Sequence, residues 1–162
     1  MTSNPLRGGC QCGAVRFSAG APFAAYCCHC TECQAQSASA FGISVVVSSE
    51  SLKVEGKTGS WLRDRGLPSE VRCTLCSTCG TRLFHSRDGT DRTTIKGGAL
   101  DHRDSLEPDG HIWLASAVPW MRRTIVCDTE DCFEGQPPDY RGLIDRWAKR
   151  GRATRTLLDE RD

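Results

Sequence analysis

The segment Cys28–Cys33, which reads CHCTEC, constrains this chain more than any other feature of its sequence. Residues i and i+2 of an extended backbone point to the same face, so Cys28 and Cys30 can reach one ion. The two residues before Cys33 allow a turn that returns a third sulfur to that ion. Thiolates suit Zn²⁺, which prefers sulfur and four ligands. The segment therefore predicts a zinc site with three protein ligands, called here the three-cysteine cluster.

Three ligands leave one position of a four-coordinate ion to be filled. A structural zinc is normally closed by four protein ligands, whereas a catalytic zinc keeps one position open. Cys27, His29 and His111 are the candidates for closing the site. Cys27 and His29 lie on the strand face opposite the first two ligands, so they are poorly aimed. We favour an open position that accepts an external thiolate, with the three-cysteine cluster as the catalytic group.

A second set of thiols comes from two pairs that are far apart in sequence. Cys10 and Cys12 form a glycine-flanked C-x-C, and Cys76 and Cys79 form a C-x-x-C that Gly80 follows. Backbone N–H groups of such a turn can point at the first sulfur, and a glycine accepts the left-handed conformation that follows. These four residues, the four-cysteine cluster, predict a structural zinc. The alternative is that they are buried hydrophobic cysteines.

Composition places these clusters in a reduced compartment. The chain has 162 residues, enough for one domain with a core, and its net charge of +1 argues against a nucleic-acid partner. The first residues form no apolar run of the signal-peptide kind, and no stretch approaches membrane-spanning length. We therefore expect a cytoplasmic protein without a membrane partner. Thiols stay reduced there, so 11 cysteines indicate metal binding rather than disulfides.

Short alternating segments between turn residues predict a mainly β fold of short antiparallel strands. We expect residues 1–140 to form a single zinc-stabilised domain and residues 141–162 a basic helical or frayed tail, with one helix over 139–149. The expected strands are Ala14–Ser18, Phe23–Cys28, Ser39–Val47, Leu52–Glu55, Ser60–Arg63, Val71–Leu75, Arg82–Ser86, Thr93–Lys96 and His111–Leu114, and a helical turn is expected at Thr31–Gln36.

Other conspicuous side chains receive structural interpretations. Trp61, Trp113 and Trp120 are scattered, so we expect them in the core rather than on a surface that stacks bases. Cys127 and Cys132 form a C-x₄-C that could bind metal or oxidise, and we expect two unrelated cysteines.

Several motifs together resemble the glutathione-dependent formaldehyde-activating enzyme family, which also includes centromere protein V. Order and spacing agree over about residues 6–120, and His111–Trp113 and Phe133–Pro137 are similar to a bacterial subgroup. One departure is Ser37-Ala38-Ser39, where the family usually has Ser-Gly-Ser. The motifs are GGCQCG at 8–13, CHCTEC at 28–33, SAF at 39–41 and CSTCGT at 76–81.

The resemblance implies a β-rich fold similar to that of Mss4, a structural zinc on the four-cysteine cluster and a catalytic zinc on the three-cysteine cluster. It also implies a reaction that joins glutathione and formaldehyde into S-(hydroxymethyl)glutathione, formally a carbon–sulfur lyase run in reverse. The cationic candidates for the two glutathione carboxylates are Arg16, Arg72, Arg82 and Lys96.

Two other interpretations of the same sequence are kept. One is a zinc-stabilised binding module without chemistry, which the basic tail and the tie to a chromosomal protein favour. The other is a thiol or zinc sensor, in which the three-cysteine cluster releases its metal on oxidation.

Overall fold

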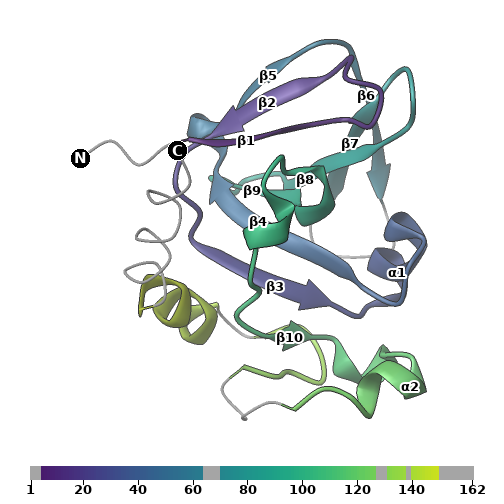
Figure 1. Ribbon diagram of the computed structural model, residues 1–162, viewed down its shortest axis with the longest axis vertical. Helices are drawn as coiled ribbons and strands as arrows, with labels where there is room; N and C mark the ends of the chain where they lie inside the picture. Colours follow the sequence, from purple (N-terminus) through teal and green to yellow (C-terminus); the bar gives the residue numbers. More distant parts are fainter. Residues whose placement is uncertain (1–4, 64–69, 127–130, 138–139, 150–162) are drawn as a thin grey trace. The chain divides into compact units, whose positions relative to one another are not determined.

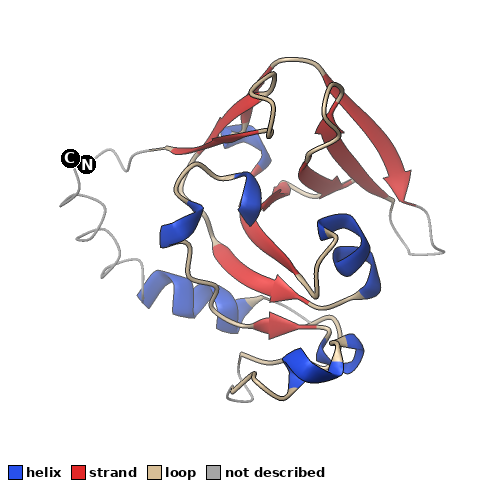
Figure 2. Ribbon diagram, turned by 45° about the vertical axis from the view of Figure 1, so that its right-hand side comes forward, coloured by secondary structure: helices blue, strands red, loops and turns tan. Residues whose placement is uncertain are grey.

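The computed structural model describes residues 5–63, 70–126, 131–137 and 140–149, and the chain divides into two compact units. The first unit combines Met1–Pro22 with Ile43–Leu106, and the second combines Phe23–Gly42 with Glu107–Asp162. Strands predominate and the helices are short (Figure 2). The predicted mainly β class is confirmed.

Two antiparallel arrangements of strands build the first unit (Figure 1). In the three-stranded sheet, β2 lies between β1 and β5. The other strands follow the order β4, β9, β8, β7 and β6. The bounds in this unit are β1 Leu6–Gly9, β2 Arg16–Ala19, β4 Gly42–Ser48, η1 Ser49–Ser51, β5 Lys53–Glu55, β6 Thr58–Arg63, β7 Val71–Cys76, β8 Arg82–Arg87, β9 Arg92–Lys96, η2 Gly97–Ala99 and η3 Arg103–Ser105.

The core of the first unit lies between these two arrangements. The ring of Phe17 on β2 meets that of Phe84 on β8 edge to face, with centroids 6.2 Å apart. Strand β1 was not predicted as a strand because glycine is depleted in strands. Gly8 is required there by close packing, since a Cβ at this position would lie 2.3 Å from the Phe17 ring and from the Ala99 carbonyl oxygen. A non-local contact therefore explains this strand.

Strand β4 differs from its predicted half-buried state. Its alternation of apolar and polar residues predicts one covered face, and Val45 and Val47 are indeed fully buried. Ser44 and Val46 on the opposite face are also buried, with exposed fractions of 1% and 7%. Both faces of the strand are covered, which the alternation alone does not predict.

In the second unit a short parallel pair of strands carries the three-cysteine segment. His111 of β10 lies opposite Cys27 of β3, and Ile112 lies opposite Cys28. The helical prediction at the end of the chain is confirmed over residues 141–149, whose Leu143 is fully buried, and residues 150–162 lie outside the described part. The bounds here are β3 Ala24–Cys28, α1 Thr31–Ser37, β10 His111–Ile112, η4 Leu114–Ser116 and α2 Pro119–Arg122.

The tryptophan predictions are wrong. Trp61, Trp113 and Trp120 have exposed fractions of 43%, 37% and 57%, so none is a core residue. The strand predicted over 111–114 ends after Ile112, because Trp113 takes the left-handed conformation with φ 62°. Within the described residues, no helix is long and apolar enough to cross a membrane.

We predict that Ala38→Gly stabilises the protein. Ala38 closes α1 in the left-handed conformation, φ 49° and ψ 42°, which costs a residue with a Cβ about 1–2 kcal/mol. Glycine removes this strain but loses about 0.5–1 kcal/mol of chain entropy on folding, so a net gain of up to about 1.5 kcal/mol is expected in denaturant unfolding. This position is the one where the resembling family usually has glycine.

The matched control is Ala35→Gly, an exposed position inside the same helix. It makes the same chemical change without a left-handed backbone to relieve, so it is expected to destabilise the protein by about 0.5–1 kcal/mol. Equal destabilisation by both substitutions would contradict the strain argument.

Candidate metal centres

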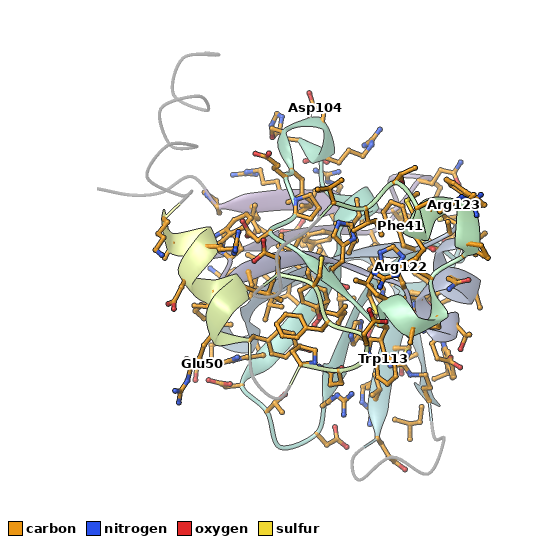
Figure 3. All side chains as sticks on the ribbon, turned by 90° about the horizontal axis from the view of Figure 1, so that it is seen from below. Phe41, Glu50, Asp104, Trp113, Arg122 and Arg123 are labelled. Carbon is orange, nitrogen blue, oxygen red and sulfur yellow. The ribbon has the colours of Figure 1, made fainter. Side chains whose placement is uncertain are left out.

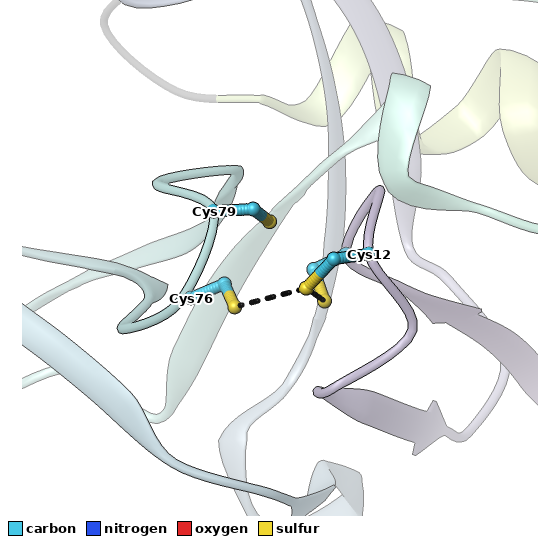
Figure 4. Close-up of side chains that lie close together, drawn as sticks. Cys12, Cys76 and Cys79 are labelled. Carbon is cyan, nitrogen blue, oxygen red and sulfur yellow. Dashed lines mark hydrogen bonds between the residues drawn. The ribbon is translucent and has the colours of Figure 1, made fainter.

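The four-cysteine cluster brings its two distant pairs together within the first unit. All four sulfurs lie within 4.8 Å of one another. The Sγ atoms of Cys10 and Cys12 are 3.5 Å apart, and those of Cys12 and Cys76 are 3.9 Å apart (Figure 4). Tetrahedral zinc with bonds of about 2.3 Å needs sulfurs about 3.8 Å apart. The arrangement therefore fits zinc.

Backbone N–H groups already point at these sulfurs. The N–H of Val15 donates to Cys10 Sγ at 3.1 Å, and that of Thr78 donates to Cys76 Sγ at 3.3 Å. Gly80 follows the C-x-x-C with φ +72°, as predicted for this turn. N–H donors favour the charged form of a thiol, so both turns are shaped to hold thiolates.

Thr81 is a supporting residue that the sequence analysis missed. Its hydroxyl accepts a hydrogen bond from the Gln11 N–H at 3.2 Å and lies 3.1 Å from Cys79 Sγ. The hydrogen bond from Thr81, helped by backbone N–H groups, lowers the pKa of Cys79 to about 5. The side chain of Thr81 thus links the loop that contains Cys10 and Cys12 to the loop that contains Cys76 and Cys79, in addition to the contacts between the sulfurs. The signal in the sequence that could have indicated this role is the threonine directly after C-x-x-C-G.

The three-cysteine cluster is assembled locally in the second unit. Cys28, Cys30 and Cys33 place their sulfurs within 4.8 Å of one another, and the first two are 3.5 Å apart. Helix α1 begins directly after Cys30, whose sulfur accepts the N–H of Cys33 at 3.4 Å as the helix cap. The predicted helical turn therefore brings the third sulfur back to the first two, as the spacing indicates.

The electrostatics of this cluster favour a bound cation. The Cys28 thiol donates a hydrogen bond to the Cys30 sulfur, and the hydrogen bonds with Cys30 and Cys33, followed by burial, raise the pKa of Cys28 far above its ordinary value. Three thiolates at this separation repel one another, so they can ionise together only beside a positive charge. Cys27 is not a member of the cluster. Burial raises the pKa of its thiol to about 11.

The two histidine candidates for the fourth position bind each other. His29 is fully buried, and its Nε2 lies 2.9 Å from Nδ1 of His111. The Phe41 ring covers His29, with centroids 5.4 Å apart. Burial, with His111 and Arg122 nearby, lowers the pKa of His29 to about 4, so it is neutral at pH 7. Among the described residues, no histidine, cysteine or carboxylate joins the three sulfurs as a fourth ligand.

The segment that follows β10 is hydrogen-bonded to the segment Cys28–Cys33 and to helix α1. Gln34 Nε2 donates to the carbonyl oxygens of His29, at 2.7 Å, and Ser116, at 2.8 Å. The Ser116 hydroxyl donates to the same His29 carbonyl at 3.0 Å. Trp113 and Arg122, labelled in Figure 3, come from this segment. It is therefore held against the three-cysteine cluster by backbone acceptors.

The C-x₄-C expectation is wrong for Cys132, which is disulfide-bonded rather than an unrelated thiol. Cys127 lies outside the described residues. The nine other cysteines form no disulfide.

Comparison with known proteins supports one family. The sequence model of the glutathione-dependent formaldehyde-activating enzymes matches residues 5–116. A solved structure of a Rhodobacter sphaeroides protein is 24% identical, with an alignment that covers 63% of this chain and 96% of that chain at a TM-score of 0.49. A search of curated proteins finds no match.

We predict that Cys76→Ser removes zinc from the four-cysteine cluster and gives insoluble or unfolded protein. Structural zinc contributes about 10–16 kcal/mol in small peptides, which is comparable with the whole stability of a domain. Zinc per chain, solubility and melting temperature are the measurements.

The matched control is Cys73→Ser. Cys73 is fully buried three residues earlier on the same strand but does not belong to the cluster. It should keep its zinc and lose only the small amount that a buried hydroxyl costs, about 1–3 kcal/mol. A soluble Cys76→Ser protein with an unchanged melting temperature would refute the structural role.

Proposed function

We propose, from the premise that the chain belongs to the glutathione-dependent formaldehyde-activating enzyme family, that it is a zinc-dependent enzyme of the carbon–sulfur lyase type. Its reaction would join a thiol of the glutathione class to formaldehyde. The observation that carries this proposal is the three-cysteine cluster, whose sulfurs converge without a fourth protein ligand among the described residues. A site of this kind has room for a substrate thiol.

The two clusters receive different roles in this proposal. Cys10, Cys12, Cys76 and Cys79 would hold a structural zinc, because four sulfurs complete its coordination. Cys28, Cys30 and Cys33 would hold a second, catalytic zinc. The division follows from ligand number alone, and it assigns folding to one cluster and chemistry to the other.

The chemistry requires a thiolate and an aldehyde in contact. Zinc bound at the three-cysteine cluster would lower the pKa of the substrate thiol so that it reacts as a thiolate at neutral pH. The thiolate sulfur attacks the formaldehyde carbon and forms the carbon–sulfur bond, while the carbonyl π pair moves to oxygen, which takes a proton from water. The product is the S-hydroxymethyl thioether, and the reverse steps release formaldehyde.

The residues around the cluster would keep its geometry constant. His29, which lies between two of the ligands in the chain, contacts His111 through its Nε2 atom, and the Phe41 ring packs against the His29 ring. Gln34 and Ser116 fasten the loop backbone through the His29 carbonyl. A three-cysteine cluster whose backbone is held in this way can orient a bound thiol without rearranging during the reaction.

The wider setting belongs to the same proposal. We place the protein in the cytoplasm, where glutathione-class thiols are reduced, with small-molecule partners and neither a membrane nor a nucleic acid as partner. We also propose that residues 1–140 act as one zinc-stabilised functional region and that residues 141–162 form a basic tail outside the chemistry.

The test is the rate of exchange between free formaldehyde and S-(hydroxymethyl)glutathione, measured by NMR with and without zinc-loaded protein. The uncatalysed reaction already runs, so only an increase over that background counts. We predict a clear increase that Cys30→Ser abolishes, because that substitution removes one of the three ligands.

The matched control is Cys27→Ser, a neighbouring buried cysteine outside the cluster, which should retain the increase if the variant folds. No increase from folded, zinc-loaded protein would reject glutathione and formaldehyde as the substrates. It would favour a different thiol, a binding module or a thiol sensor.

A further inference from the structure

Strand β6 is the outer strand of the arrangement β4, β9, β8, β7 and β6 in the first unit (Figure 1). Among the described strands it pairs with β7 alone, over its full length from Thr58 to Arg63 and without a register shift. Its sequence, TGSWLR, contains no proline, lysine or acidic residue. Natural edge strands use such residues, and bulges, to avoid pairing with another chain. Strand β6 is therefore an unprotected edge that can accept an additional strand.

The ladder between β6 and β7 defines which backbone groups of β6 point outward. The N–H of Ser77 donates to the Lys57 carbonyl at 3.1 Å, one step before the first residue pair of the two strands. Antiparallel ladders alternate between hydrogen-bonded and non-hydrogen-bonded pairs, so Thr58, Ser60 and Leu62 turn their N–H and C=O groups away from β7. Within the described part of the chain, no loop or cap bonds to these groups. We call the outward groups of these three residues the β6 edge.

Two large apolar side chains flank the β6 edge, one on each side of the sheet. Trp61 and Leu62 are consecutive in the strand, so they point to opposite faces, and each is 43% exposed. Trp61 lies opposite the fully buried Cys73, so it is on the face that covers the core. Leu62 lies opposite the exposed Arg72 on the outer face. A strand added at this edge would bury more of both apolar side chains, which favours its binding.

The surroundings of the β6 edge are cationic. Lys57 is exposed directly before the strand, Arg63 ends the strand, and Arg72 is exposed on the outer face of β7. Among the described residues, none of these three side chains forms an ion pair. The strands β6, β7, β8 and β9 contain no aspartate or glutamate, since Glu55 ends β5 and Glu70 precedes β7. An incoming segment with carboxylates would therefore meet positive charge.

The same charges argue against a second copy of this chain as the occupant of the edge. Antiparallel pairing of β6 with itself about Ser60 would place Lys57 of each copy opposite Arg63 of the other. Like charges directly opposite each other in a sheet are destabilising. A segment that carries acidic residues avoids this repulsion and gains an attraction, so it fits the edge better than a second copy does.

We propose that the β6 edge binds an extended acidic segment of a partner protein by antiparallel strand addition. In this mode main-chain hydrogen bonds supply affinity and alternate side chains supply specificity. Residues directly opposite each other share a face, so the partner residues that bond to Thr58, Ser60 and Leu62 have their side chains on the outer face, on the side of Arg72. Acidic residues are expected at those positions, and apolar residues are expected at the alternate positions on the side of Trp61. The site does not depend on the proposed reaction.

The probe is a fluorescein-labelled peptide of about seven residues in which glutamate and valine alternate, which is long enough to span the strand. Its dissociation constant for the whole zinc-loaded protein is measured by fluorescence anisotropy at low ionic strength. N-methylation of the glutamate amides is expected to abolish binding, because those N–H groups would bond to the β6 edge. N-methylation of the valine amides, which point away from the edge, is the matched control and should weaken binding much less.

Substitutions in the protein test the same edge. Ser60→Pro removes the central outward N–H without removing a hydrogen bond to β7, so it is expected to weaken peptide binding by about tenfold or more. Its matched control, Ser60→Thr, keeps the N–H and should keep the affinity. Arg72→Gln should weaken binding by about twofold to fivefold, as for loss of an exposed ion pair. Arg7→Gln removes an exposed cation from β1 and should have no effect. Zinc content and melting temperature establish that each variant is folded.

Several outcomes would overturn the proposal. Equal binding of a peptide with glutamine in place of glutamate would remove the charge argument, and equal affinities of Ser60→Pro and Ser60→Thr would reject the edge. If Ser60→Pro does not fold, the two N-methylated peptides decide the question, since equal binding of both would refute strand addition. A dimer in sedimentation velocity that Ser60→Pro dissociates would assign the edge to a second copy and refute an acidic partner. Formaldehyde exchange should be unchanged in folded Ser60→Pro, so this binding and the proposed reaction can fail separately.

Discussion

The convergence of four sulfurs from two distant loops is the constraint on which the first unit depends. Cys10 and Cys12 follow β1, whereas Cys76 ends β7 and Cys79 lies in the turn before β8. In each loop a backbone N–H group donates its hydrogen bond to a cysteine sulfur rather than to a neighbouring strand. This arrangement is unfavourable for four neutral thiols and favourable for thiolates around a cation. The arrangement of the four sulfurs therefore fits a bound metal cation.

The three-cysteine cluster is built on a different physical basis. Its ligands come from one short segment, so no long-range closure is needed to assemble it, and the cap of α1 is one of its sulfurs. Long-range contacts flank the cluster: Nε2 of His29 lies 2.9 Å from Nδ1 of His111, and Gln34 Nε2 donates to the Ser116 carbonyl. Each compact unit thus carries one cluster, the first closed by sulfur and the second with three sulfurs.

Agreement between sequence and structure is best where the decisive contacts are local. The three-cysteine cluster, the two chelating pairs of the four-cysteine cluster, the positive φ of Gly80, the helical turn after Cys30 and most strands follow from spacing over a few residues. Agreement fails for Trp61, Trp113 and Trp120, because whether a large apolar side chain is covered depends on which distant element lies above it. The prediction that Cys132 is an unrelated cysteine also fails, because the formation of a disulfide depends on a geometry that spacing in the sequence does not define.

The sequence by itself determined the chelating pairs, the mainly β class and the family, because each is encoded in residue identity at short range. Only the tertiary structure decided that His29 and His111 contact each other and that Arg16 is ion-paired with Asp101. These properties depend on strand register and on burial. A hydrogen bond between residues far apart in sequence exists only once the chain has brought them to about 3 Å, and no local pattern specifies that distance.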